Sequence, residues 1–205
     1  MLQVARRALS LPYGTLTHVN TERFWQLVNT ARVSEEPLHE ALTRLLTARG
    51  TEDICAFHAR FDQLDTVVDR WDVWAAASLI GGGCSDDRFM DFKAGLIALG
   101  RSWYERAVRC PDDLAEHPDV QHAIATGIDE AVFYEEMGFT GVRAYGRVTG
   151  DEDGFYPAVD RYRAHHGEPE AEHHDMGEDF DFDDVQEMRR RLPRLAALYL
   201  KDIQA

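Results

Sequence analysis

The chain has 205 residues, of which 22 are basic and 37 are acidic, so its formal net charge is −15. A protein that gains affinity by neutralising phosphates needs a basic face, and this excess of carboxylates argues against nucleic acid as a partner. The length is that of one domain with little left over. A hydrophobic fraction of 44% is ordinary for a globular protein that buries a core.

The cysteines and the apolar runs indicate the cellular compartment in which the protein is expected. The three cysteines are Cys55, Cys84 and Cys110. Their odd number and their spacing indicate neither a disulfide framework nor a zinc knuckle, and no cofactor is expected. No apolar run approaches the roughly 20 residues needed to span a bilayer. We therefore expect a protein of the reducing cytoplasm that does not enter a membrane.

Residues 1–19 are expected to form a loose N-terminal extension, because Pro12 and Gly14 interrupt their short apolar run. Organised sequence begins at Asn20, a favourable helix N-cap residue. Residues 20–205 are expected to form a single helical domain.

Apolar side chains recur at the three- and four-residue spacing of amphipathic helices along most of the chain. This spacing predicts helices that begin near Thr21, Ser34, Thr51 and Trp71, and further helices over 89–108, 120–138 and 183–199. Pro193 is expected to bend or split the last of them.

Two stretches lack this periodicity. Residues 141–167 hold five glycines and scattered tyrosines, and loops with short strands or turns are expected there. Residues 165–182 are acidic and nearly devoid of apolar side chains, which predicts a solvated loop. The predicted fold class is therefore mainly α: a single-domain bundle of six to eight helices, with an irregular acidic segment before the C-terminal helix.

One block of the chain carries a distinctive series of turns and helix starts. The series comprises WDVW at 71–74, GGGCSDDRF at 81–89, DFK at 91–93, LI at 96–97, PDDL at 111–114 and PRL at 193–195. This pattern resembles the bacterial family catalogued as domain of unknown function 4240, over Thr21 to Tyr199. The resemblance implies the family and its fold but no reaction, since no activity is attached to the family.

One position departs from the family's pattern. Where that pattern has a tryptophan before Leu-Ile, this chain has Gly95. A glycine inside a long helix costs up to about 1 kcal/mol relative to alanine, so its presence indicates either close helix packing or room for a ligand. We expect a cavity or groove beside Gly95.

The glycine-rich turn at 81–89 has two interpretations. In the first, the glycines shape the turn, Ser85 caps the next helix, and Asp86 and Asp87 complement its dipole. In the second, Asp86 and Asp87 are catalytic as general acid and base, with Asp91 one turn later in the same pocket. The expected ligand-binding residues around that pocket are Trp71, Trp74, Ser85, Asp91, Gly95 and Arg101.

A cysteine and three arginines near this block could also take part in a reaction or in ligand binding. Cys84 precedes a helix start, where a thiolate would be stabilised, but no histidine lies nearby to act as its base, and a buried structural thiol is the simpler interpretation. Arg70, Arg101 and Arg106 flank the aromatic residues and could clamp a carboxylate or phosphate. Ion pairs with neighbouring acidic residues are the preferred explanation for these arginines.

Four of the nine histidines fall within ten residues. They are His165, His166, His173 and His174, interleaved with carboxylates. Such a cluster would bind zinc or nickel if it were rigid. Because the surrounding sequence is that of a solvated loop, no metal site is predicted. A metal site formed by these four histidines is the alternative interpretation.

The sequence leaves two functions open. In the first, the protein is an enzyme, or a binder of a small molecule or peptide, with its pocket around the glycine-rich turn. In the second, it is a non-catalytic interaction or regulatory module whose acidic C-terminal segment meets a basic protein partner. A concave site lined by convergent carboxylates or arginines favours the first, and a flat apolar surface rimmed by charges favours the second.

Overall fold

The computed structural model of the chain describes residues 19–128, 130–168 and 175–200. These residues form thirteen helices and no strand, so a mainly α fold is confirmed, whereas the expected number of six to eight helices is wrong. The helices are α1 (Thr21–Arg32), α2 (Leu38–Thr47), α3 (Thr51–Val67), α4 (Trp71–Gly81), α5 (Asp86–Ala98), α6 (Arg101–Arg109), the 3₁₀-helix η1 (Pro111–Glu116), α7 (Pro118–Thr126), α8 (Glu135–Gly138), α9 (Thr140–Thr149), α10 (Phe155–His166), α11 (Val185–Arg191) and α12 (Pro193–Tyr199).

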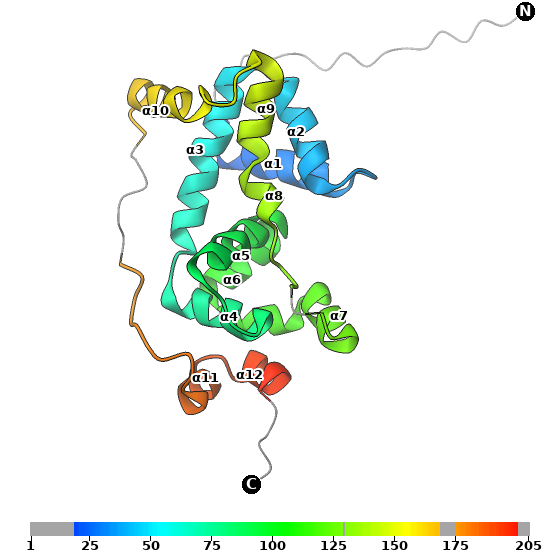
Figure 1. Ribbon diagram of the computed structural model, residues 1–205, viewed down its shortest axis with the longest axis vertical. Coiled ribbons are helices and arrows are strands. Elements are labelled where there is room, and N and C mark those ends of the chain that lie inside the picture. Colours follow the sequence, from blue (N-terminus) through cyan, green and yellow to red (C-terminus); the bar gives the residue numbers. More distant parts are fainter. Residues whose placement is uncertain (1–18, 129, 169–174, 201–205) are drawn as a thin grey trace, which may run out of the picture.

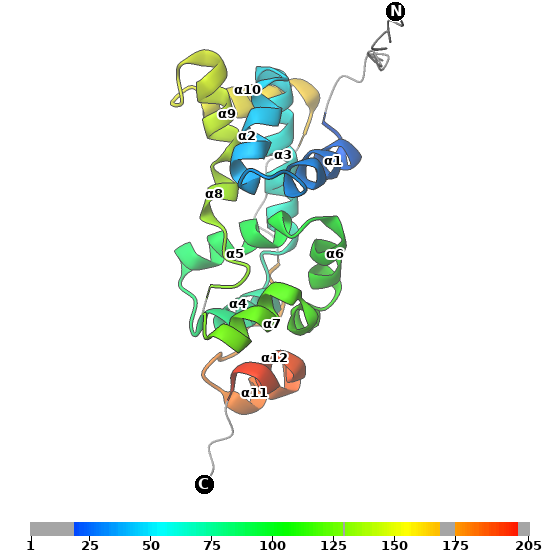
Figure 2. The ribbon, with the colours of Figure 1, turned by 90° about the vertical axis from the view of Figure 1, so that its right-hand side faces the viewer.

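The helices form two groups along an elongated molecule (Figures 1 and 2). In the first group α2 packs on α1 and α9, and α3 packs on α9 and α10. In the second group η1 packs on α6, α7 and α12, and α12 also packs on α4. The long helix α3 contacts α5, and α8 packs on α5 as well as on α9, so these elements join the two groups.

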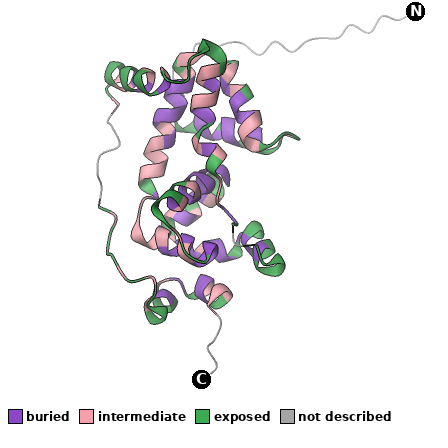
Figure 3. Cartoon of the chain, in the orientation of Figure 1, coloured by how far each residue is buried: buried purple, intermediate pink, exposed green. Residues whose placement is uncertain are grey.

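A single hydrophobic cluster runs through both groups and includes residues from Val19 to Ala196. Within the first group the rings of Phe24 and Phe57 are stacked with centroids 4.5 Å apart. The buried residues lie on the inward faces of the helices (Figure 3). Residues 1–18, most of the expected N-terminal extension, lie outside the described residues, and Val19 is already part of the core.

The helix expected over 89–108 is two helices, because Gly100 separates α5 from α6. Gly100 has a φ of +84°, a left-handed conformation that glycine adopts at little cost and other residues avoid. A Cβ at this position would also lie 2.5 Å from Nη1 of Arg32 on α1. The glycine therefore ends α5, redirects the chain and allows α1 to approach the start of α6.

The helix expected over 120–138 is also wrong. α7 ends at Thr126, where Gly127 has a φ of +70°, and only the short α8 follows. Ala131 and Val132 extended the apolar pattern and are indeed buried, but they lie in a turn segment that packs on α5. Burial of these residues therefore mimicked helical periodicity.

The loops expected over 141–167 are replaced by α9 and α10. The glycines that weakened the prediction serve close packing instead: Gly141 is buried, and a Cβ there would lie 2.8 Å from the ring of Phe155. Tertiary contacts of this kind override low helix propensity. One consequence is that His165 and His166, which were placed at the start of the acidic loop, belong to the end of α10.

The C-terminal part of the chain is split at Pro193 into α11 and α12, as expected. Before α11, residues 175–184 carry exposed carboxylates, but Met176 and Phe182 of this segment contact Trp71 at the start of α4. The carbonyl oxygen of Met176 accepts a hydrogen bond from the N–H of Trp71 at 3.1 Å. Phe180 and Phe182 pack against the core. We call residues 175–200 the C-terminal arm.

None of the helices in the described part of the chain is both long enough and apolar enough to cross a membrane.

Candidate functional site

The glycine-rich turn joins the end of α4 to the start of α5 through two helix caps. Gly82 ends α4 in a left-handed conformation, and the Ser85 side chain accepts a hydrogen bond from the N–H of Arg88 at 3.4 Å. Nε1 of Trp74 donates to the carbonyl oxygen of Cys84 at 3.0 Å, which fixes the turn against α4. These contacts explain the turn by capping, without a ligand.

The two aspartates proposed as acid and base occupy the first turn of α5. Asp86 and Asp87 are exposed, and within the described residues their side chains make no hydrogen bond or ion pair. Asp91, one turn later, is half-buried, and its pKa is raised by burial and then by the nearby charges of Glu135 and Asp87. A catalytic role for Asp86 and Asp87 stays a prediction.

The tryptophans expected as pocket walls lie in an aromatic stack. The rings of Trp71 and Trp74 are parallel with centroids 5.4 Å apart, and those of Trp74 and Phe89 are parallel at 4.7 Å. Phe182 of the C-terminal arm packs edge-on against Trp71 at 6.2 Å. Packing alone therefore accounts for these rings, and ligand binding by Trp71 or Trp74 stays a prediction.

The expected cavity beside Gly95 is wrong, because backbone occupies that space. A Cβ on Gly95 would lie 1.4 Å from the carbonyl oxygen of Val132 and 2.6 Å from its carbonyl carbon. The neighbouring N–H of Tyr134 donates to the carbonyl oxygen of Asp91 at 3.0 Å, which fixes this crossing of the chain over α5. Close packing, and not room for a ligand, is the reason for a glycine here.

The Cys84 thiol is not arranged as a nucleophile. Burial raises its pKa to about 11, with smaller contributions from the charges of Asp91 and Asp86. A thiol that is protonated at neutral pH reacts slowly, because the thiolate is the reactive form. The structure therefore favours the interpretation of Cys84 as a structural thiol.

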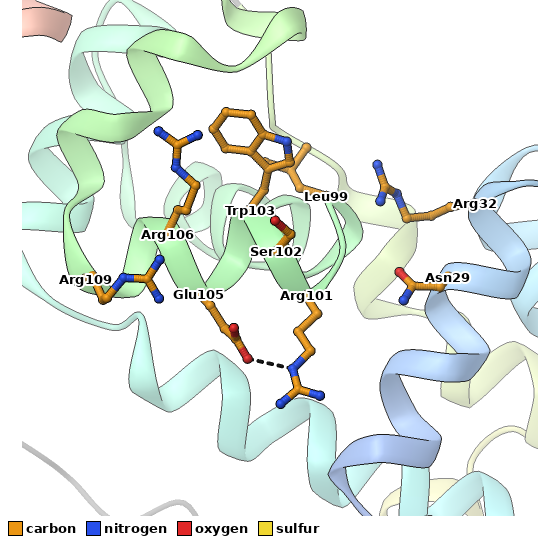
Figure 4. A pocket seen from close by; sticks show the side chains of 9 residues that line it. All are labelled: Asn29, Arg32, Leu99, Arg101, Ser102, Trp103, Glu105, Arg106 and Arg109. Atoms are coloured by element: carbon orange, nitrogen blue, oxygen red, sulfur yellow. Dashed lines mark hydrogen bonds and ion pairs between the residues drawn. The ribbon is translucent and has the colours of Figure 1, made fainter.

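Arg101 lies in a different place from the other sequence candidates, in an open groove between α1 and α6 (Figure 4). The groove has a volume of about 500 Å³. Asn29 and Arg32 reach it from α1, whereas most of the remaining residues come from α6. The lining consists of Asn29, Arg32, Leu99, Arg101, Ser102, Trp103, Glu105, Arg106 and Arg109.

The sequence of α6 explains why so many polar side chains meet here. Its buried residues are Tyr104 and Ala107, three positions apart and thus on one face. The hydroxyl of Tyr104 donates to the carbonyl oxygen of Leu64 at 2.7 Å, which anchors that face to α3. The three arginines of α6 consequently lie on its other faces, outside the buried one.

Four arginines line the groove, and they divide into two pairs. Nε of Arg101 lies 2.6 Å from Oε1 of Glu105, and Nη2 of Arg106 lies 2.6 Å from Oε2 of Glu116. Arg32 and Arg109 are exposed, and in the described part of the chain neither has an ion-pair partner. Two guanidinium groups are thus available to a ligand anion, although acidic residues far outnumber basic ones.

Trp103 gives the groove an aromatic surface. The guanidinium carbon of Arg106 lies 4.4 Å from the centre of the indole, and the ring of His117 meets its edge at 4.6 Å. The pKa of His117 is lowered, chiefly by burial and further by the positive charge of Arg32. The groove therefore combines positive charge with a half-buried aromatic ring.

The histidine cluster is only partly described. His166 packs on Tyr162 with ring centroids 4.4 Å apart and His165 is exposed, while His173 and His174 lie outside the described residues. Within the described residues no group of three or more histidine, cysteine or acidic side chains is placed to hold a metal ion.

A family model described as "Protein of unknown function (DUF4240)" matches residues 19–147. The match spans more than half of the chain, so the protein belongs to the DUF4240 family. The matched region contains both the glycine-rich turn and the groove, whereas α10 and the C-terminal arm follow it. No curated protein and no solved structure matches the chain.

The sequence placed Arg101 among the expected ligand-binding residues, but it preferred ion pairs as the explanation for both Arg101 and Arg106, and both do make them. Arg70, for which an ion pair with a neighbouring acidic residue was also preferred, pairs with Asp72, with Nη2 and Oδ2 2.7 Å apart. The sequence missed Arg32 and Arg109. A basic residue in the last turn of a helix is ordinary, since it complements the helix dipole, and both arginines hold that position. Only the tertiary contact of α1 with α6 brings them to the lining of one groove.

Proposed function

We propose that this protein is a binding module for a small organic anion, a carboxylate or a phosphate ester, in the groove between α1 and α6. One observation carries the proposal: Arg32 and Arg109, which have no ion-pair partner within the described residues, line a groove beside Trp103. The guanidinium group binds carboxylates and phosphates through paired hydrogen bonds. An exposed hydroxyl at Ser102 adds another donor.

The indole favours a ligand with an apolar or planar portion next to its charge. Binding sites for small molecules typically combine such a surface with a few polar groups that fix orientation. The Trp103 ring is already polarised by Arg106 on one face. A planar anion that stacks beside the indole and meets Arg32 or Arg109 with its charged group satisfies both features.

The groove supports binding better than catalysis. General acid–base chemistry needs a titrating group within hydrogen-bond reach of the reacting atom. Glu105, the one carboxylate of the lining, is held by Arg101, and arginine does not give up its proton in proteins. The three cysteines are free, which supports the reducing, cytoplasmic setting that we propose for this module.

A second candidate function is binding of a basic protein partner by the acidic part of the C-terminal arm. All six carboxylate residues of 175–184 are exposed, while Met176 and Phe182 hold the same segment to α4. An anchored row of outward carboxylates is suited to electrostatic attraction of a basic surface. Isolation of a basic partner whose binding is lost on replacing these six residues by amides would support it.

Calorimetric titration at low ionic strength tests the groove, with inorganic phosphate, phenyl phosphate and benzoate as probes. We expect saturable binding that is tighter for the aromatic anions. Arg32→Ala and Arg109→Ala are each expected to weaken it about tenfold. Arg23→Ala is the matched control, since Arg23 is an exposed residue of α1 outside the groove.

Absence of binding by the unaltered protein would refute the proposal. So would an equal loss of affinity in all three variants, because that result indicates attraction to net charge and not to this groove.

A further inference from the structure

Two carboxylates connect the groove to the C-terminal arm. Glu116 lies 2.6 Å from Nη2 of Arg106 on one side and 2.8 Å from Nη1 of Arg194 on the other. Asp113 likewise contacts Nε of Arg106, at 3.3 Å, and Nη2 of Arg194. Arg106 lines the groove, and Arg194 belongs to α12 of the arm. Each carboxylate is therefore shared between a groove residue and an arm residue.

The arm is held in this position by a third carboxylate. Asp112 is 4% exposed, and it accepts hydrogen bonds from the backbone N–H groups of Arg194 and Leu195 at 3.1 and 2.9 Å. Nε of Arg194 also lies 3.1 Å from Oδ2 of Asp112. The start of α12 is thus fixed, and with it the place of the Arg194 guanidinium.

The charges of this network depend on the arm. With Arg194 in place, Asp113 and Glu116 each face two guanidinium groups; without it, they face Arg106 alone. Hydrogen bonds from Arg194 and Arg106 lower the pKa of Asp113, and one from Arg106 chiefly lowers that of Glu116, so both carboxylates are ionised at neutral pH. Without Arg194, the negative charges of Asp113 and Glu116 would be balanced by Arg106 alone. These two carboxylates would then repel an anion in the groove.

We propose that Arg194 is a positioning residue for the anion site: by neutralising Asp113 and Glu116 from the far side, it prevents their negative charges from outweighing that of Arg106, which remains paired with them, and so from repelling an anion in the groove. This inference rests on the proposed function and adds its regulation. Docking of the arm and binding of the anion must then favour each other, because a coupling free energy between two sites is reciprocal.

The test measures affinity of the full-length protein for phenyl phosphate in four forms: unaltered, Arg194→Met, Glu116→Gln, and the two changes combined. Arg194→Met is expected to weaken binding about three- to tenfold, because the variant lacks one positive charge of the network beside the groove. Glu116→Gln is expected to strengthen binding slightly. The double variant is expected to recover most of the lost affinity, because removing one of the two carboxylates left without Arg194 restores the net charge of the network.

Rescue separates the electrostatic role of Arg194 from a merely structural one, since removing Glu116 cannot restore a contact that holds the arm. Hydrogen exchange of the amides of Arg194 and Leu195 gives the reciprocal measurement, and saturating phenyl phosphate is expected to slow it. Binding that is unchanged in Arg194→Met, or weakened without recovery in the double variant, overturns this inference alone. Absence of binding by the unaltered protein overturns the proposed function, and this inference with it.

Discussion

Gly95 of α5 lies directly against the carbonyl group of Val132, with no room for a methyl group between them. Gly95→Ala is therefore expected to force the two segments apart and to lower the free energy of unfolding by about 1–3 kcal/mol or more. Gly138→Ala is the control, because a Cβ at Gly138 has nothing within 4 Å. Thermal unfolding measures both, and a Gly95→Ala protein that melts with the control would contradict the close packing.

Asp112 is expected to be the principal anchor of the C-terminal arm. Asp112→Ala leaves two backbone N–H groups and a guanidinium without their shared acceptor, a loss of about 2–4 kcal/mol when the contacts are buried. Urea unfolding and hydrogen exchange at α12 measure the change. Asp153→Asn, at an exposed residue in the described part of the chain, should leave both unaltered; an equally small effect at Asp112 would show that the arm is held elsewhere.

The Cys84 thiol is expected to resist alkylation at neutral pH. Burial raises the pKa of the Cys84 thiol to about 11. The thiolate fraction of Cys84 should therefore still grow about tenfold with each pH unit in the range where the thiol of glutathione is already ionised and its alkylation rate no longer rises. Pulsed labelling with iodoacetamide, followed by peptide mass spectrometry, gives the rate at this residue. A rate at neutral pH equal to that of glutathione would restore Cys84 as a candidate nucleophile.

His58 and Asp62 lie at the contact of α3 with α10, with Nε2 and Oδ1 3.6 Å apart. Burial lowers the pKa of His58 to about 4 and raises that of Asp62 to about 6. Folded His58 binds its proton less tightly than the unfolded chain does, so its contribution to stability is complete above pH 6.5 and is lost as the pH falls toward 4. Folded Asp62 binds its proton more tightly, so its contribution is complete below pH 3.8 and is lost as the pH rises toward 6.

The contributions of His58 and Asp62 to the pH dependence of stability oppose each other. A variant that lacks one of the two residues should therefore show the contribution of the other alone. Asp62→Asn should make the unfolding free energy rise more steeply between about pH 4 and 6 than in the unaltered protein, and His58→Phe should make it rise less or fall. Because the two opposed contributions add in this comparison, the change in unfolding free energy across this range should differ between the variants by about 3–5 kcal/mol. Urea unfolding at a series of pH values measures it, and parallel curves for all three proteins would contradict the assigned shifts.

Local signals in the sequence predicted local features well. Ser85 caps α5 and Pro193 divides α11 from α12, because a cap depends on one side chain and a nearby amide, and a proline break on one ring. These features need no knowledge of which helix lies next to which.

Features that depend on tertiary contact could not be predicted in the same way. The sequence does not distinguish a glycine that ends a helix, as Gly100 does, from one that allows two segments of the chain to pack closely, as Gly95 and Gly141 do. The expected cavity at Gly95 failed for this reason. The groove escaped notice because Arg32 and Arg109 come from helices far apart in the chain, and each has an ordinary local explanation at its helix end.

The indole N–H resonances of the four tryptophans give the most direct test of the anion groove. In a titration with phenyl phosphate followed by nuclear magnetic resonance, anion binding in the groove is expected to give a saturable shift of the Trp103 resonance, assigned by its loss in Trp103→Phe, with little change at Trp25, Trp71 and Trp74. An unmoved Trp103 resonance, or a saturable shift confined to Trp71 and Trp74 beside the glycine-rich turn, would contradict it.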